Sequence, residues 1–172
     1  MKNKFIYTTC LVALLALCSL PARINAQDTK QDKQAAKDAA IKNLVDSQSY
    51  DFVVQTVTPL SGRTRQLTSD YDLQVTKSSI VSYLPYFGRA YQAPINSTQS
   101  PLTFTSKDFE YTATPAKKGG WNVLIKPKDN REVQQMNLSI SASGYGSLQV
   151  TSTNRQPISF YGYIKALKGK KT

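Results

Sequence analysis

The chain has 172 residues, carries a formal net charge of +11 at pH 7 and contains no histidine. Its two cysteines, Cys10 and Cys18, lie near the start, so the rest of the chain has neither cysteine nor histidine. This composition argues against zinc, copper, haem and iron–sulfur sites, and it excludes catalysis by a Ser-His-Asp triad or a Cys-His pair. We therefore expect no cofactor and no metal.

Residues 1–26 are predicted to be a cleavable secretory signal peptide. Lys2 and Lys4 form a basic start, a mostly apolar run follows from Phe5 to Leu20, and Ala26 is a small residue suited to cleavage. The alternative is a membrane-spanning helix, but the run is shorter than the roughly 20 apolar residues that a bilayer core requires. The sequence therefore predicts a periplasmic or secreted protein.

Cys18 allows a second interpretation, a lipid anchor, because a bacterial lipoprotein carries its lipid on a cysteine at the end of the apolar run. The residue before it, Leu17, is bulky, whereas the processing peptidase prefers a small residue there. Cleavage after Ala26 would release the protein, and a lipid on Cys18 would tether it to a membrane. We expect a membrane as a partner only if Cys18 is lipidated.

The chain that would remain after cleavage at Ala26 is basic, with 19 basic and 11 acidic residues. This balance indicates either attraction to anionic lipid head groups and acidic polysaccharides or ordinary solubility charge. Only the C-terminal tail, Lys165 to Lys171, gathers positive charge. Nucleic acid is not an expected partner for an exported protein.

Residues 27–49 are predicted to form a helical lead-in. Apolar side chains recur there at helical spacing: Ala35, Ala36, Ala39, Ala40, Ile41, Leu44 and Val45. Asp and Lys residues occupy the opposite side, and the segment from Gln27 to Lys33 has no apolar residue. We expect the apolar stripe near Leu44 and Val45 to pack on a sheet.

From residue 50 the hydrophobic period changes from 3.6 to 2, which predicts one β-domain over residues 50–167, followed by a basic tail at 168–172. About nine short strands alternate apolar with polar residues, and turns are expected at 59–62, 117–120 and 144–146. The predicted fold is all-β, an antiparallel meander closing into a barrel-like or two-layer sandwich domain with one N-terminal helix. Periodicity does not separate the barrel from the sandwich.

Three segments carry a resemblance to a known family: 67–73 (LTSDYDL), 84–91 (LPYFGRAY) and 154–162 (NRQPISFYG). With them the chain resembles a family of exported proteins from Bacteroidales that is catalogued as domain of unknown function 4251. The resemblance extends over the signal peptide, the helical lead-in and the β-domain. It implies a location in a Gram-negative cell envelope, and it implies no activity.

The candidate ligand-binding residues lie in the aromatic segment 84–91 and are Tyr86, Phe87, Arg89 and Tyr91. Pro85 and Gly88 interrupt strand alternation, so the segment forms a shaped turn. One interpretation is a recognition loop whose rings stack on sugars or apolar ligands while Arg89 pairs with a carboxylate or phosphate. The other is a plug, in which the rings cap the β-core and Arg89 binds backbone carbonyls.

Two carboxylate pairs raise the alternative of a hydrolase. Asp70 and Asp72 share one face of a strand, as do Asp108 and Glu110, with a spacing of ~7 Å that suits an inverting glycosidase. Such pairs are more often solvated polar faces. The sequence therefore favours a non-enzymatic binding module for a small amphipathic ligand, an envelope glycan or a partner protein; the alternatives are a carboxylate-dependent hydrolase and a purely structural envelope protein.

Overall fold

Strand-forming sequence dominates the described part of the chain, which in this computed structural model comprises residues 25–91, 100–117 and 119–167. Helix α2 spans Asn25–Ser47 and crosses the boundary between two compact units, Met1–Ala35 and Ala36–Thr172. The predicted N-terminal helix is thus confirmed, and it ends at Ser47. Residues 1–24 of the predicted signal peptide, which include Cys18, and the predicted tail at 168–172 lie outside the described residues, whereas Asn25 and Ala26 begin α2.

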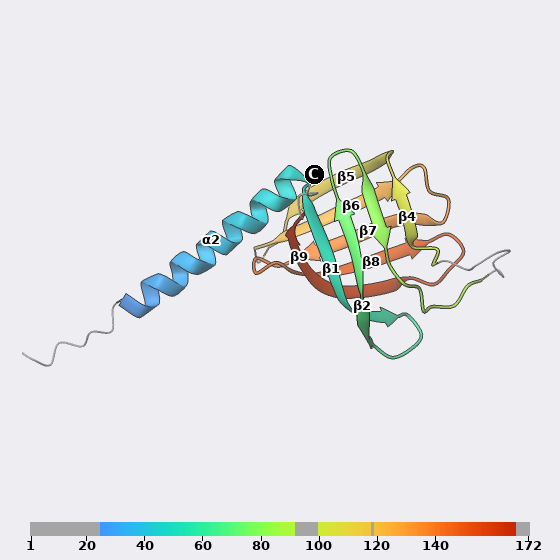
Figure 1. Cartoon of the computed structure of the whole chain (residues 1–172), viewed down its shortest axis with the longest axis horizontal. Coiled ribbons are helices and arrows are strands. Elements are labelled where there is room, and N and C mark those ends of the chain that lie inside the picture. The colour runs from blue at the N-terminus through green and yellow to red at the C-terminus, as the bar shows by residue number, and fades with distance from the viewer. Residues whose placement is uncertain (1–24, 92–99, 118, 168–172) are drawn as a thin grey trace, which may run out of the picture. The chain divides into compact units, whose positions relative to one another are not determined.

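Nine strands follow α2 in the second unit (Figure 1). They are β1 (Tyr50–Pro59), β2 (Arg65–Val75), β3 (Ile80–Tyr83), β4 (Thr103–Ser106), β5 (Phe109–Pro115), β6 (Trp121–Pro127), β7 (Val133–Ile140), β8 (Tyr145–Ser152) and β9 (Ile158–Ala166). The expected number of strands and the change of period at residue 50 are both confirmed.

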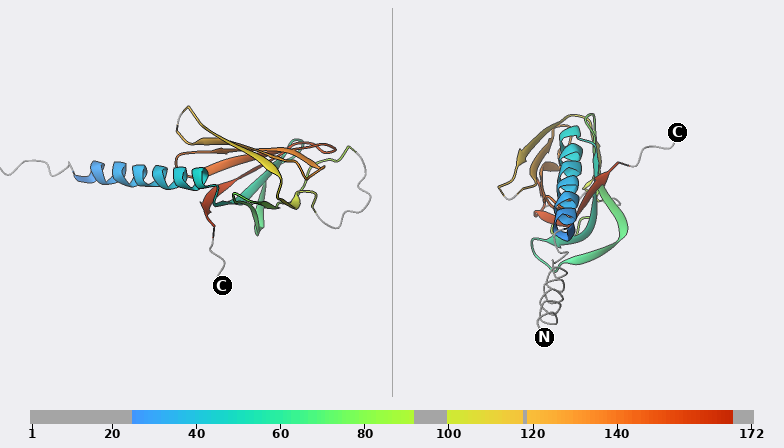
Figure 2. Two further views of the ribbon diagram at one scale, coloured as in Figure 1. Left: turned by 90° about the horizontal axis from the view of Figure 1, so that it is seen from above. Right: turned by 90° about the vertical axis from the view of Figure 1, so that its left-hand side faces the viewer.

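One sheet contains all nine strands, in the order β4-β3-β2-β1-β9-β8-β7-β6-β5. Every neighbouring pair is antiparallel, including β1 with β9. Apart from β1–β9, each pair joins strands that follow one another in the chain, so the predicted meander is confirmed. The sheet curves around a common interior as a nearly closed barrel rather than splitting into a sandwich (Figure 2).

The two edge strands, β4 and β5, run in the same direction, as the antiparallel pairings on both sides require. Only Lys107 and Asp108 separate them. Asp129, in the loop after β6, holds this junction: its carboxylate accepts hydrogen bonds from the Ser106 hydroxyl (2.5 Å) and from the backbone N–H groups of Lys107 (2.8 Å) and Asp108 (3.3 Å). The two strands therefore act as one bent strand that pairs with β3 over its first half and β6 over its second.

The barrel interior is filled with apolar side chains. Alternate residues of β1, β6, β7, β8 and β9 face inward, as period-2 sequence requires. The largest fully buried side chains are Tyr50, Phe52, Phe160, Leu73, Ile80, Leu84, Leu102, Ile125, Met136, Leu138, Leu148 and Ile158. Because the interior is occupied, any site for a ligand lies at an end or on the outer wall.

The last turns of α2 close one end of the barrel. Ile41 and Leu44 pack against the core, and Val45 is fully buried. The Tyr111 hydroxyl donates a hydrogen bond to the Val45 carbonyl oxygen (3.2 Å) and lies 3.4 Å from the Tyr50 hydroxyl. The expectation that the apolar stripe of the helix packs on the sheet is therefore confirmed. We call this the helix end.

Two local predictions differ from the structure. The turn expected at 144–146 lies earlier, at 141–144, because Gly144 (φ 87°) supplies the left-handed conformation and Tyr145 already begins β8. Strand β2 begins at Arg65, well before residues 72–76, where its sequence alternates regularly between polar and apolar residues. Its first part was not recognised because it is largely exposed and includes a bulge at 67–70, between Gln66, paired with Thr56, and Tyr71, paired with Val54.

Candidate functional site

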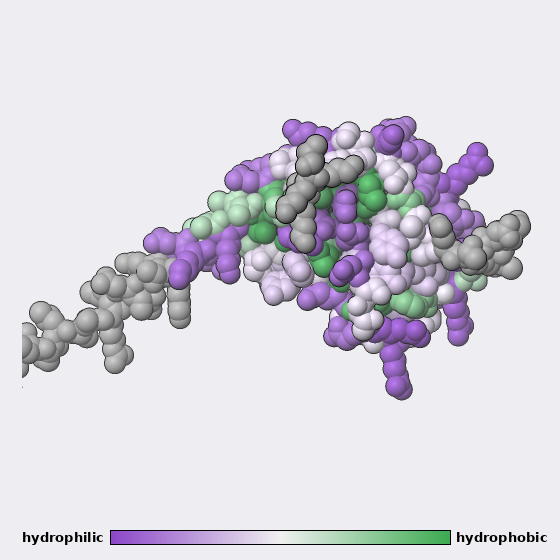
Figure 3. Space-filling view, in the orientation of Figure 1, coloured by the Kyte–Doolittle hydropathy of each residue, from purple (hydrophilic) through white to green (hydrophobic). Residues whose placement is uncertain are grey.

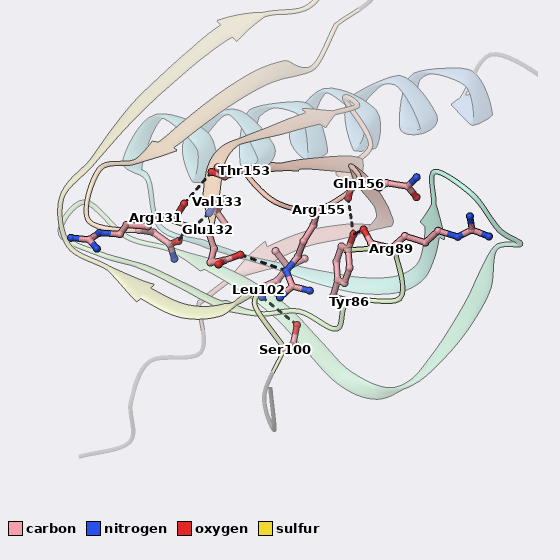
Figure 4. Close-up of polar contacts among 11 residues, drawn as sticks. Tyr86, Arg89, Ser100, Leu102, Arg131, Glu132, Val133, Thr153, Arg155 and Gln156 are labelled. Carbon is pink, nitrogen blue, oxygen red and sulfur yellow. Dashed lines mark hydrogen bonds and ion pairs between the residues drawn. The ribbon is translucent and has the colours of Figure 1, made fainter. Parts of the chain in front are cut away.

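The connections after β1, β3, β6 and β8 lie at the barrel end opposite α2, because these four strands run in the same direction. We call this the loop end. Its loops bind one another (Figure 4): the Thr153 N–H donates to the Glu132 carbonyl oxygen (2.9 Å) and the Thr153 hydroxyl to the Arg131 carbonyl oxygen (3.0 Å). The backbone at Ala90 also forms an isolated bridge with Arg155.

The loop end contains a hollow of about 620 Å³. We call it the loop-end hollow. Aromatic and small polar side chains and one cation line it: Tyr71, Tyr83, Leu84, Pro85, Tyr86, Phe87, Ser100, Pro101, Thr103 and Arg155. Its volume falls in the range of small-molecule sites, about 300–1,000 Å³.

Tyr86 is held by two loops at once. Its hydroxyl lies 2.9 Å from the Arg89 carbonyl oxygen and 3.0 Å from the Gln156 carbonyl oxygen, and it donates towards both. Its ring lies over Gly88, where an added Cβ would come within 2.4 Å of the Tyr86 hydroxyl oxygen. Burial raises the pKa of Tyr86, an effect that the Arg155 charge partly offsets, so the phenol stays a neutral donor at physiological pH.

Arg155 lies behind the Tyr86 ring, with its guanidinium carbon 5.3 Å from the ring centroid. Its Nε is 3.5 Å from Glu132 Oε2, and only 13% of its side chain is exposed. The Nε atom of Arg155 is buried and makes no hydrogen bond within the described part of the chain. A mostly buried cation, ion-paired with Glu132, therefore forms part of the wall of the hollow (Figure 4).

The other three candidate residues from the sequence, Phe87, Arg89 and Tyr91, differ in their position relative to the hollow. Phe87 lines the hollow and is 41% exposed, and the Arg65 guanidinium lies 5.1 Å from its ring centroid. Tyr91 is 65% exposed, and its N–H donates to the Asn154 carbonyl oxygen (2.8 Å). The Arg89 side chain is exposed and points away from Tyr86 and Arg155 (Figure 4). The carbonyl contacts that the plug interpretation gave to Arg89 are made by Tyr86.

Sequence reasoning missed Tyr71, Tyr83 and Arg155 as parts of the hollow. The rings of Tyr71 and Tyr83 lie 5.3 Å apart, centroid to centroid, and form one wall. Arg155 lies in the segment 154–162 that carried the family resemblance, so its position next to a proline-containing turn was the available indication. Only the fold reveals that β2, β3 and the β8–β9 loop lie close together around the hollow.

The first carboxylate pair lies on the outer wall of the barrel. Asp70 and Asp72 do line a common hollow of about 340 Å³, together with Asp51 and Lys165. Lys165 forms an ion pair with Asp51 (3.1 Å), and the Gln74 amide donates to Asp72 (3.0 Å). This hollow is on the outer wall, and its polar groups bind mainly one another.

The second pair, Asp108 and Glu110, lacks the features of an acid catalyst. Glu110 is exposed and lies 3.1 Å from Lys128, whose hydrogen bond and charge lower the pKa of that carboxyl rather than raising it as a general acid needs.

Over the described ranges no group of three or more His, Cys, Asp or Glu side chains is placed to hold a metal ion. Nor is any described helix sufficiently long and apolar to cross a bilayer.

The visible surface is mostly polar. On the face in Figure 3, hydrophobic residues form separate patches between hydrophilic side chains that project from the rim of the barrel. The large apolar or aromatic side chains that remain exposed on the described residues are Leu60, Tyr83, Phe87, Tyr91, Tyr145 and Tyr161. Three of them, Tyr83, Phe87 and Tyr91, lie in or beside the hollow.

Comparison with known proteins gives a family and a fold. The model of a family described as domain of unknown function (DUF4251) matches residues 32–164. The crystal structure of a DUF4251 family protein from Bacteroides eggerthii DSM 20697 is similar, with a TM-score of 0.56 and 13% sequence identity over 77% of this chain and 91% of that one. No curated protein matches. The predicted family is thereby confirmed, and the structural likeness bears on the fold alone.

Proposed function

The chain belongs to the DUF4251 family, and we propose that it is an exported, non-enzymatic binding module whose loop-end hollow holds a small amphipathic ligand with an anionic group. The observation that carries the proposal is Arg155. This side chain is 13% exposed and lines the hollow, and its Nε makes no hydrogen bond within the described residues.

The chemistry of the wall supports this class of ligand. Arg155 is mostly buried and has only one long ion pair, so a second anionic partner is favoured, because unsatisfied hydrogen-bonding groups of a charged side chain are costly in a low-dielectric site. Glu132 approaches only the Nε side, at 3.5 Å. A carboxylate or phosphate in the hollow would accept two parallel hydrogen bonds from the remaining donors, the geometry that arginine favours.

The aromatic part of the wall supports an apolar or planar ligand body. Tyr71, Tyr83 and Phe87 present ring surface to the hollow, and each ring can contribute stacking or apolar contact. The Tyr86 ring separates Arg155 from part of the opening, and its hydroxyl is already bonded to backbone carbonyl oxygens. Tyr86 therefore shapes the hollow, and the other rings contact the ligand.

A titration with 8-anilinonaphthalene-1-sulfonate, an aromatic anion, tests this site on the processed protein. Arg155→Gln is expected to weaken binding about tenfold or more, as removal of a charge-assisted hydrogen-bonding group should. Tyr83→Ala is expected to weaken it severalfold, by loss of apolar contact. Tyr161→Ala, an exposed tyrosine on the outer wall, is the matched control and should bind like the original protein.

Thermal unfolding of each variant separates loss of the site from loss of the fold. The proposal fails if Arg155→Gln and Tyr83→Ala both remain folded and bind the probe unchanged. Native mass spectrometry of the protein matured in its own envelope then identifies the natural ligand. We expect an excess mass that leaves on gentle activation, and that Arg155→Gln no longer retains.

A further inference from the structure

Arginine and lysine are distributed unequally over the barrel. All five arginines that follow residue 26 lie in or beside loop-end connections: Arg63 and Arg65 at the β1–β2 hairpin, Arg89 after β3, Arg131 after β6 and Arg155 after β8. The described lysines occur in α2, at the helix end and along the strands, except Lys128, which lies in the connection after β6 and forms an ion pair with Glu110 (3.1 Å). Arginine is the residue that recognises planar anions such as phosphates through paired hydrogen bonds, so the loop end has the chemistry of an anion-binding surface.

Exposed apolar side chains gather on the same loops. Leu60, at the tip of the β1–β2 hairpin, is 67% exposed; Phe87 and Tyr91, in the loop after β3, are exposed to 41% and 65%. An exposed leucine or phenylalanine alone is ordinary, but several on neighbouring loop tips point to a surface that buries them elsewhere.

A side-chain contact joins the two loops. The Arg65 guanidinium lies 5.1 Å from the centroid of the Phe87 ring, and the hairpin is closed by a hydrogen bond between the hydroxyls of Thr58 and Thr64 (2.8 Å). The β1–β2 hairpin and the loop after β3 are therefore neighbours at the loop end, and both carry exposed apolar side chains and arginines. We call this surface the arginine–aromatic rim, and it comprises Leu60, Arg63, Arg65, Phe87, Arg89 and Tyr91.

Positive charge on this rim is not neutralised within the described part of the protein. No described carboxylate forms an ion pair with Arg63, Arg65 or Arg89. The two loop-end acids in the connections after β6 and β8 are occupied: Glu132 faces Arg155, and Asp129 binds Ser106 and the adjacent backbone. The rim therefore suits an anionic partner that can also accept apolar side chains.

We propose that the arginine–aromatic rim docks on an anionic lipid bilayer. Phosphate head groups bind the arginines, and Leu60, Phe87 and Tyr91 enter the interfacial layer, where apolar and aromatic side chains are stabilised. An acidic polysaccharide would satisfy the arginines but would leave the leucine and phenylalanine in water. A second copy would place one cationic rim against another, which is repulsive.

Co-sedimentation with vesicles tests the proposal, using the processed protein purified from its own envelope. Binding is expected to vesicles of phosphatidylcholine with phosphatidylglycerol and to be much weaker with phosphatidylcholine alone. Arg63→Gln with Arg89→Gln should weaken partitioning about 25-fold, about fivefold per arginine. Leu60→Ser with Phe87→Ser should weaken it about tenfold. Tyr145→Ser with Tyr161→Ser, on the outer wall, is the control and should leave binding unchanged.

A fluorescence reporter adds a readout of insertion. In a Trp121→Phe background, which removes the single tryptophan, Phe87→Trp should show a blue shift with anionic vesicles, and Tyr145→Trp should show none. Equal binding to both vesicle types, or loss of binding in the arginine variant without effect in the Leu60 and Phe87 variant, would overturn the proposal. The latter result would indicate purely electrostatic binding, as to a polysaccharide.

The docking surface shares Phe87 with the loop-end hollow but does not include Arg155. Arg155→Gln removes the anchor proposed for the small ligand but no residue of the rim, so this variant should bind vesicles normally. If it binds vesicles but not 8-anilinonaphthalene-1-sulfonate, the two sites are independent. If it loses vesicle binding while folded, the rim is not the docking surface and the inference fails.

Discussion

The Tyr111 hydroxyl of β5 donates a hydrogen bond to the Val45 carbonyl oxygen in the last turn of α2, over 3.2 Å. This bond joins the barrel wall to the helix that closes its end. Tyr111→Phe keeps the ring and removes the bond, leaving the Val45 carbonyl oxygen without this donor. We expect a loss of about 1 kcal/mol in the free energy of unfolding, measured by urea denaturation. Tyr145→Phe alters an exposed hydroxyl and should change stability much less.

Tyr111 and its neighbour Tyr50 make the stability of the protein sensitive to alkaline pH. Burial raises the pKa of Tyr50 well above its ordinary value and also raises that of Tyr111. The stability from the neutral phenols is therefore complete below the unfolded-state pKa of about 10, and it is lost as pH rises above that value. We expect the urea midpoint to fall above about pH 10 and to fall less steeply in Tyr50→Phe. An equal slope in that variant would contradict the assignment.

Gly88 controls the position of Tyr86. A Cβ at residue 88 would lie 2.4 Å from the Tyr86 hydroxyl oxygen and 2.6 Å from the ring carbon that bears it. Gly88→Ala should therefore displace the ring from both carbonyl oxygens and destabilise the protein by about 1–3 kcal/mol. In a Tyr86→Phe background much of this cost should disappear, because the bonds are already absent. Simple addition of the two effects in the double variant would argue against the coupling.

Asp129 is expected to control local opening at the β4–β5 junction. The Ser106 hydroxyl and the backbone N–H groups of Lys107 and Asp108 lower the pKa of its carboxyl. This stabilisation is present above the unfolded-state pKa and is lost as pH falls through the lower folded-state value. Asp129→Asn should speed amide exchange at Lys107 and Asp108 at neutral pH. Exchange at Val123, within β6, serves as the internal control.

Local sequence predicted most of the barrel because short-range rules determine its parts. Gly119 and Gly120 adopt φ values of 79° and 90°, and the expected hairpin lies there. The pairing of β1 with β9 could not be predicted, since nothing in either strand identifies a partner so distant in the chain. Barrel and sandwich share one alternation pattern, and only this pairing distinguishes them.

The candidate site was predictable only in part, for the same reason. The density of rings around Pro85 indicated Tyr86 and Phe87, which do line the hollow. Arg89 was the cation nearest in sequence, yet Arg155 is the one beside Tyr86. Proximity in the chain is a poor guide where loops from separate strand pairs meet.

The pairing of β1 with β9 also bears on how the chain folds. Every other pairing joins neighbours in sequence, whereas this one brings Tyr50 opposite Ala166. Most of the entropic cost of loop closure therefore arises when β1 pairs with β9, while the hairpins can form locally beforehand. Substitutions along the β1–β9 seam should change the rate of folding, whereas substitutions that weaken contacts made only after the seam has closed should mainly accelerate unfolding.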